Sequence, residues 1–186
     1  MNGSVRIIGG KWRGRKLAVA PLPQLRPSPD RVRETLFNWL APYISGAQCL
    51  DLFAGTGALG LEAVSRGAAG VTLLERDPRA AEFLRHSVDT LGAEGISVIE
   101  HDAISWLRAH DAVPFDIVFL DPPFGQGMIE SAVDELKRGW LKQRAWVYLE
   151  AEKIPILHLQ TAGWLLLRQG QTRRVQFALA ENKPPD

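Results

Sequence analysis

Cysteine is almost absent from this 186-residue chain, in which Cys49 stands alone. A single cysteine cannot form an intramolecular disulfide, so nothing in the sequence points to an oxidising compartment. Long apolar runs are missing too: no stretch approaches the ~18 apolar residues that cross a bilayer, and the opening MNGSVRIIGG lacks the apolar centre of a secretory signal. These shortages predict a cytoplasmic protein that does not insert into a membrane.

Clustered metal ligands and the common nucleophile motifs are lacking as well. No histidine has a companion in an H-x-x-x-H or C-x-x-C pattern, so the sequence predicts no metal site. Neither a G-x-S-x-G motif nor a P-loop lysine occurs, which argues against an α/β-hydrolase or a P-loop nucleotide hydrolase.

The net charge is small, +1, but it is unevenly distributed along the chain. Eight of the 22 Lys and Arg residues lie within residues 1–33, against a single acidic residue there, Asp30. A basic arm on a mildly acidic body favours a polyanionic partner, although a solvated terminus gives the same pattern. With 46% hydrophobic and 23% charged residues, the chain has the material for one globular domain.

Hydrophobic periodicity predicts an α/β fold behind a small hairpin. Residues 5–8 and 15–19 form two β-like stretches, and a proline-rich loop leads to Asp30, the expected N-cap of a helix that ends before Pro42. Short apolar runs then alternate with helical stretches that begin near Ala58, Pro78, Ala103 and Met128, a pattern typical of a parallel sheet covered on both faces. The predicted strands are CLDLF, GVTLLE, ISVIE, FDIVFL and AWVYLE, followed by a hairpin of WLLLRQG and RRVQFALA.

A glycine-rich segment follows the first of these strands. Asp51-Leu-Phe-Ala-Gly55-Thr-Gly57-Ala-Leu-Gly60 opens a helix, and Glu75 ends the second strand 20 residues after Gly55. Glycines let the backbone turn tightly near a ligand, and an acid at this spacing can bind ribose hydroxyls. On these residues alone, a nicotinamide dehydrogenase and a methyltransferase fit about equally well.

Two aspartates favour the methyltransferase. Asp51 precedes the glycine loop, where a carboxylate would repel a pyrophosphate but accept a cationic sulfonium with an amino-acid tail. Asp121-Pro122-Pro123-Phe124 ends the fourth strand, at the sheet edge where open α/β folds bind ligands. Paired prolines also make rigid turns anywhere, but this position beside the glycine loop favours a functional role.

Three motifs in order carry a family resemblance. DPPF resembles the (D/N/S)-P-P-(F/Y/W) signature of class I amino-methyltransferases, and DLFAGTGALG resembles their S-adenosylmethionine-binding motif. RIIGGKWRGRKL and RPSPDRVRETLFNWL resemble the arm of the RsmD family, bacterial methyltransferases of guanine N2 in 16S ribosomal RNA. The likeness covers nearly the whole chain, with Pro29 a departure where a hydroxyl residue is expected. It implies a Rossmann-like, seven-stranded, mostly parallel sheet with a reversed last strand, plus the N-terminal hairpin.

The resemblance also implies roles for individual residues. Asp121 and the carbonyl of Pro122 would accept hydrogen bonds from the target amine, and Phe124 would stack on the base. Asp102 would contact the cofactor's adenine, although it could equally cap the following helix. The residues expected to bind S-adenosylmethionine are Asp51, Phe53, Gly55, Gly57, Glu75, Asp102 and Ala103.

Ribosomal RNA, naked or in an assembling small subunit, is the expected partner. The residues expected to bind it are Arg6, Lys11, Trp12, Arg13, Arg15, Arg26, Arg31 and Arg33, with Trp12 the candidate for base stacking. We expect residues 1–29 to form the arm and its loop, 30–180 the methyltransferase domain, and 181–186 a frayed tail. The alternatives are an adenine-N6 or glutamine-amide methyltransferase using the same DPPF site, an inactive RNA-binding module, and, weakest, a dehydrogenase.

Overall fold

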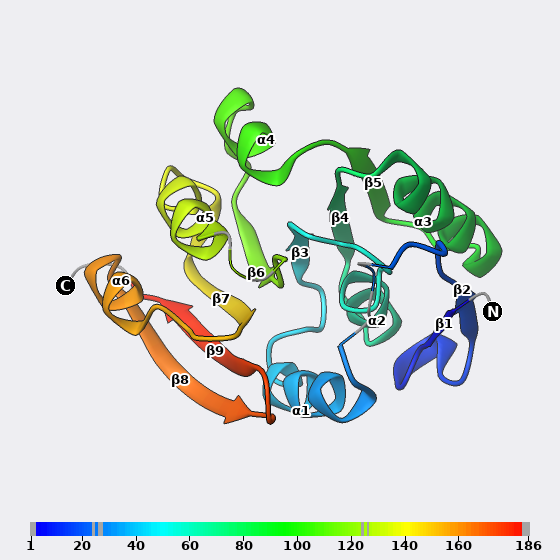
Figure 1. The fold of residues 1–186 in the computed structure, drawn as a ribbon, viewed down its shortest axis with the longest axis horizontal. Helices are drawn as coiled ribbons and strands as arrows, with labels where there is room; N and C mark the ends of the chain where they lie inside the picture. Colours follow the sequence, from blue (N-terminus) through cyan, green and yellow to red (C-terminus); the bar gives the residue numbers. More distant parts are fainter. Residues whose placement is uncertain (1–2, 24, 26–27, 124, 126, 184–186) are drawn as a thin grey trace.

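A central seven-stranded sheet organises the computed structural model, which describes residues 3–23, 25, 28–123, 125 and 127–183. The strand order is β5-β4-β3-β6-β7-β9-β8 (Figure 1). The pairs β3–β4, β3–β6, β4–β5 and β6–β7 are parallel, whereas β9 is antiparallel to both of its neighbours. The bounds are β3 Gln48–Asp51, β4 Gly70–Glu75, β5 Ile96–Glu100, β6 Phe115–Leu120, β7 Leu141–Ala151, β8 Trp164–Gln171 and β9 Gln176–Asn182. The α/β sheet with a reversed last strand is therefore confirmed.

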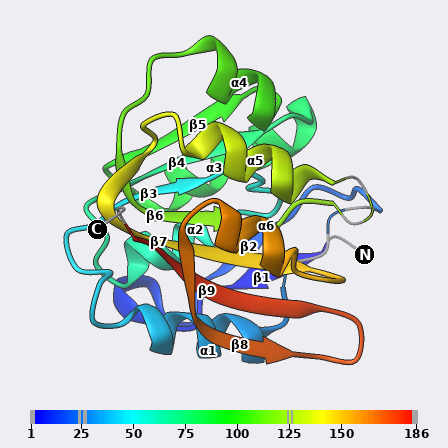
Figure 2. The ribbon, with the colours of Figure 1, turned by 90° about the vertical axis from the view of Figure 1, so that its left-hand side faces the viewer.

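Helices cover both faces of this sheet (Figures 1 and 2). One face packs against α1 (Asp30–Leu40), α2 (Gly60–Ser65) and α3 (Pro78–Leu91), and the other against α4 (Ala103–Ala109), α5 (Met128–Leu136) and α6 (Ile156–Thr161). Neighbouring strand residues point to opposite faces of the sheet. Cys49 therefore packs in the core beneath α1, α2 and α3, and Leu50 in the core beneath α4, α5 and α6. Burial of each large apolar side chain stabilises the folded state by about 1.5–3 kcal/mol.

The helices after β4 and β5 begin at aspartate caps. Asp77 accepts hydrogen bonds from the amides of Arg79 and Ala80 at 2.9 and 3.3 Å. These caps satisfy amides that have no partner within the helix, so each helix starts directly behind its strand. Because these connections are short, little of the chain covers the carboxyl ends of β4 and β5.

The N-terminal arm is a two-stranded hairpin of β1 (Ser4–Arg6) and β2 (Lys16–Ala18), with a 3-10 helix at Gly10–Trp12. The arm is joined to α2 through Glu62, which is fully buried and accepts the amides of Ile8 and Gly9, each at 2.8 Å. The Trp12 amide donates to the Ser65 hydroxyl at 3.0 Å. The arm is thus packed against the body of the molecule.

Three details differ from the sequence-based predictions. The N-cap of α1 is Pro29, and Asp30 lies inside the first turn, where its carboxylate pairs with Arg6 and Arg33 instead of capping. The expected frayed tail is wrong for residues 181 and 182, because β9 continues through Asn182, whose side chain donates to the Lys142 carbonyl. The short helix α6 was not predicted.

Candidate active site

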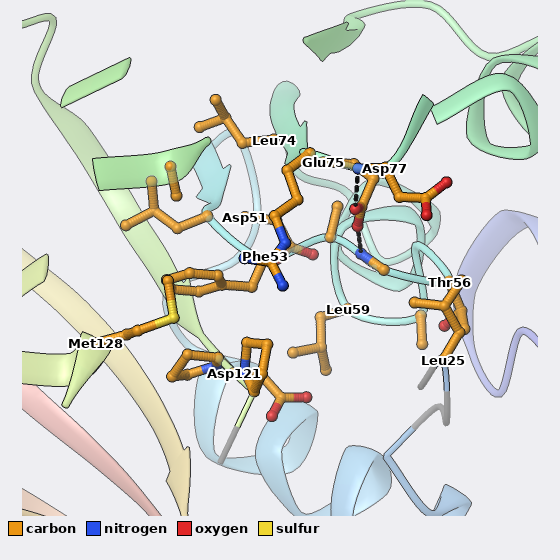
Figure 3. Close-up of a pocket in the computed structure, with 18 of the residues that line it drawn as sticks. Leu25, Asp51, Phe53, Thr56, Leu59, Leu74, Glu75, Asp77, Asp121 and Met128 are labelled. Carbon is orange, nitrogen blue, oxygen red and sulfur yellow. Dashed lines mark hydrogen bonds between the residues drawn. The ribbon is translucent and has the colours of Figure 1, made fainter. Parts of the chain in front are cut away.

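A pocket of about 1100 Å³ opens at the carboxyl ends of the parallel strands. This is the edge where an open α/β sheet binds ligands, and the volume suits a cofactor together with part of a substrate. Figure 3 shows Asp51, Glu75 and Asp121 entering it from different strand ends. Its lining comes from residues 23, 25 and 28, residues 51–56, 58 and 59 of the glycine loop, residues 74–78, 101–103 and 121–123, and Met128, Glu152 and Arg174.

Glu75, at the end of β4, holds the glycine loop in place. One carboxylate oxygen accepts the Gly55 amide and the other accepts the Asp77 amide, both at 2.8 Å (Figure 3). Gly57 has a φ of 76°, and a Cβ there would lie 2.6 Å from the Leu84 side chain, so only glycine fits. Because a carboxylate has about four lone-pair sites, Glu75 can still accept hydrogen bonds from a ligand in the pocket.

Asp51, at the end of β3, has a buried carboxyl group that can accept further hydrogen bonds. It is 1% exposed; its Oδ2 accepts the Gly60 amide at 3.1 Å, and its Oδ1 has no hydrogen-bond partner among the described residues. Burial, with a smaller contribution from nearby Glu75, raises the pKa of Asp51 to about 7. A ligand that brings a cationic donor would satisfy Oδ1 and favour the ionised carboxylate.

Asp102 has the structural role that the sequence left open. Its Oδ1 accepts the Ser105 amide at 2.9 Å, so it caps α4, and this hydrogen bond lowers the pKa of its carboxyl. Asp102 and Ala103 also line the pocket, so capping does not preclude contact with a ligand.

A cluster of polar side chains surrounds Asp121, at the end of β6. The Ser28 hydroxyl lies 3.1 Å from Asp121 Oδ2 and 3.0 Å from Glu150 Oε2, and the Tyr148 hydroxyl donates to the same Glu150 oxygen at 2.7 Å. Burial and then the neighbouring Glu150 raise the pKa of Asp121 well above its usual range, and burial raises the pKa of Glu150. Perturbed carboxyls in a pocket are typical of functional sites.

Sequence reasoning missed Ser28 and Glu150. Ser28 belongs to the RPSPDR segment, in which the sequence predicts a role only for the arginines. Glu150 lies near the end of β7, the position at which β3 and β4 also carry acids, and that regularity could have revealed it.

The structure brings most of the predicted cofactor and catalytic residues together, and Phe124 lies outside the described residues. Eight line the pocket, and Gly57 belongs to the same loop. The eight are Asp51, Phe53, Gly55, Glu75, Asp102, Ala103, Asp121 and Pro122.

Two of the predicted RNA-binding residues are instead structural. Trp12 is 7% exposed and packs in the core beneath the arm, so its ring cannot stack on a base. Arg33 is 1% exposed, and its guanidinium donates to Asp30 and to the carbonyls of Arg6 and Ser28. Sequence reasoning assigned both to RNA because local pattern does not reveal tertiary burial.

The other predicted RNA-binding residues are exposed. They are Arg6, Lys11, Arg13, Arg15 and Arg31, whereas Arg26 lies outside the described residues. Among the described residues, no group of three or more His, Cys, Asp or Glu could hold a metal ion, and none of their helices is both long and apolar enough to cross a membrane.

The fold and the pocket together define a class of protein. A seven-stranded sheet of this order with a reversed last strand, a glycine loop after β3 and an Asp-Pro-Pro turn after β6 are the features of a class I methyltransferase. The family model described as Conserved hypothetical protein 95 matches residues 5–181, and the chain belongs to this family.

Similar proteins are consistent with this class. The chain is 49% identical over 183 residues to "Ribosomal RNA small subunit methyltransferase D" of Escherichia coli (strain K12), covering 98% of this chain and 92% of that protein. The Haemophilus influenzae protein of the same name is 46% identical, with coverages of 97% and 95%. A solved structure of the Escherichia coli protein yhhF has 48% identity and a TM-score of 0.87, covering 98% of this chain and 100% of that one. The resemblance to the RsmD family is thus confirmed.

Proposed function

We propose that this chain transfers a methyl group from S-adenosylmethionine to the exocyclic N2 amine of a guanine in 16S ribosomal RNA. The observation that carries the proposal is the position of Asp121, whose carboxyl enters the pocket formed by the glycine loop. The names of the Escherichia coli and Haemophilus influenzae relatives support ribosomal RNA of the small subunit as the substrate. On this proposal the protein works in the cytoplasm, on RNA or on an assembling subunit.

The pocket fits S-adenosylmethionine by the chemistry of its lining. Asp51 offers the unpartnered Oδ1 to a cationic donor, Glu75 offers acceptors to ribose hydroxyls, and Asp102 offers an acceptor to the adenine amino group. Phe53 and Ala103 supply apolar surface to the same lining. When bound, the cofactor supplies an electrophilic methyl carbon on its sulfonium.

Asp121 and Pro122 orient the reacting amine. The lone pair of a guanine amine is delocalised into the ring, which makes it a poor nucleophile. Two acceptors, the Asp121 carboxylate and the Pro122 carbonyl, bind its two N–H groups and so direct the lone pair at the methyl carbon. Phe124, in this proposal, stacks on the base after it has left its helix.

Mass spectrometry of nucleosides from 16S ribosomal RNA, with and without the gene, tests the substrate. We expect one N2-methylguanosine to disappear when the gene is deleted and to return with the wild-type chain. Loss of N6-methyladenosine, or of methylated glutamine in a protein, would replace the guanine assignment with one of the alternatives. Titration calorimetry with S-adenosylmethionine and with NADH tests the cofactor, and binding of NADH alone would contradict the proposal.

A further inference from the structure

One hydroxyl group that lines this pocket, that of Ser28, lies between two carboxyls, the half-buried Asp121 and the buried Glu150. Ser28 Oγ is 3.1 Å from Asp121 Oδ2 and 3.0 Å from Glu150 Oε2, and Ser28 and Glu150 are only 7% and 5% exposed. Ser28 is held there independently of the carboxyls, since Arg33 Nε donates to its backbone carbonyl at 3.2 Å. The arrangement is therefore built into the fold and joins the loop before α1 to the ends of β6 and β7.

A serine hydroxyl has a single hydrogen, so it can donate to only one of the two carboxyls. If both carboxyls were ionised, one would face the oxygen lone pairs of Ser28, and two negative charges would share a buried site. One additional proton removes both conflicts. The protonated carboxyl then donates to Ser28 Oγ, and Ser28 donates to the ionised one.

Among the described residues, no cationic side chain is hydrogen-bonded or ion-paired to either member of the pair. Of the described residues, Asp51 from β3 and Tyr148 from β7 act on the pair directly, and Arg33 from α1 holds the backbone of Ser28. Glu152, after β7, and Arg174, from the β8–β9 turn, line the same pocket. Asp51 acts against ionisation of Asp121, and Arg33 binds the backbone of Ser28 and not the carboxyls. Both members of the pair have pKa values raised by burial, which agrees with a retained proton.

We propose that Asp121 and Glu150 share one proton through Ser28, and that Ser28 and Glu150 are positioning residues that hold Asp121 ready to take the proton of the target amine. This proposal rests on the proposed function. As the amine lone pair forms the new N–C bond, the carbon–sulfur bond of the methyl donor breaks and its electron pair leaves with the sulfur as a neutral thioether. One N–H bond of the amine also breaks, and its electron pair stays on nitrogen. The proton forms an O–H bond on the pair, which then carries two protons and later releases one to water.

The first experiment measures single-turnover methyl transfer to 16S RNA against pH at saturating cofactor. The wild type should show an alkaline limb, where the shared proton is lost. Glu150→Gln should remove that limb, because its amide donates permanently to Ser28 as the protonated acid does. Ser28→Ala should lower the rate at least tenfold, Ser28→Thr should recover it by restoring the hydroxyl, and Ser131→Ala is the matched control. A wild-type alkaline limb that persists unchanged in Glu150→Gln would overturn the proposal.

The second experiment needs no activity. Carbon-13 NMR of side-chain carboxyls in the free protein, with Asp121→Asn to assign the signal, should show Asp121 titrating above the ordinary range. Glu150→Gln should lower this pKa by removing a like charge, and Ser28→Ala should raise it by removing a donor. Ordinary titration of both carboxyls would overturn the shared proton even if guanine is methylated. A raised, coupled titration without RNA methylation would support the shared proton and contradict the proposed function.

Discussion

Asp121 places a carboxyl group in a half-buried site beside a second acid, a combination that costs folding stability and is typical of functional sites. On the proposed function, Asp121→Ala removes one of two acceptors for the amine and leaves the glycine loop intact. Turnover should fall on the order of a hundredfold or more, the loss typical of one preorganised partner. Affinity for S-adenosylmethionine should stay within a few-fold, as measured by calorimetry.

Asp121→Asn keeps an acceptor oxygen and the shape of the side chain, so it should retain partial activity. Near-normal methyl transfer by Asp121→Ala in a single-turnover assay would make the Asp-Pro-Pro turn a purely structural element.

Glu75 has two tasks, since it fixes the Gly55 and Asp77 amides and faces the pocket. Glu75→Ala should weaken cofactor binding by about 1–3 kcal/mol, the contribution of hydrogen bonds to a charged group. RNA binding, followed by fluorescence anisotropy, should persist. Unchanged affinity for S-adenosylmethionine would remove Glu75 from the cofactor site.

Asp51 should make the stability of the ligand-free protein depend on pH. Its pKa is about 7 when folded, against an ordinary value of 3.8, so the folded state binds the additional proton between these values. The free energy of unfolding therefore falls as the pH rises from about 4 to 7, by at most about 4 kcal/mol from this group. Asp51→Asn should lose this part of the dependence. Denaturant unfolding of both proteins at pH 5 and pH 8 measures the difference, and parallel pH dependence would contradict the burial argument.

Single residues were predictable where their position along the chain determined their place in the fold. Glu75 and Asp121 end strands, and parallel strands bring their ends together. Ser28 could not be assigned in this way, because its partners are 93 and 122 residues away. The burial of Trp12 depends in the same way on a distant element, α2.

At the scale of elements, the docking of the arm depends on one buried acid. Glu62 accepts two arm amides and the Arg66 Nε at 2.7 Å, and lies 3.6 Å from the buried Arg33 guanidinium. Glu62→Ala leaves these donors unpaired and should cost about 3–5 kcal/mol. Thermal unfolding should show a Tm lower by roughly 10 °C. Glu82→Ala, an exposed acid on α3, is the control and should change little.

The bounds of elements with a clear hydrophobic pattern could be predicted nearly to the residue. The β4, β5 and β6 strands coincide with GVTLLE, ISVIE and FDIVFL, because each is a short apolar run bounded by turn residues. The six residues of α6 are too few to display a helical period. The residue type of Asp30 predicts a cap, but its carboxylate instead binds Arg6 and Arg33, partners that local pattern does not identify.

At the scale of the whole molecule, the exposed basic residues of the arm lie at the opposite end of the sheet from α5 and β8 (Figure 1). Neutralising Arg13, Arg15 and Lys16 together should weaken RNA binding and reduce its salt dependence, with the slope falling by roughly 0.7–0.9 for each phosphate that the arm no longer binds. Neutralising Lys137, Arg144 and Arg168, at the other end, is the matched control. An equal effect from both sets would mean that RNA responds to net charge alone.

The position of β9 has a consequence for biosynthesis. This strand lies between β7 and β8, both of which leave the ribosome before it. Until residues 176–182 have emerged, β7 presents an open edge and β8 has no neighbour in the sheet. The nascent chain can assemble β3 to β7 early, but β8 stays unpaired until β9 has been synthesised. Translation pauses or truncations just before β9 should therefore yield aggregation-prone chains, whereas interruptions after it should not.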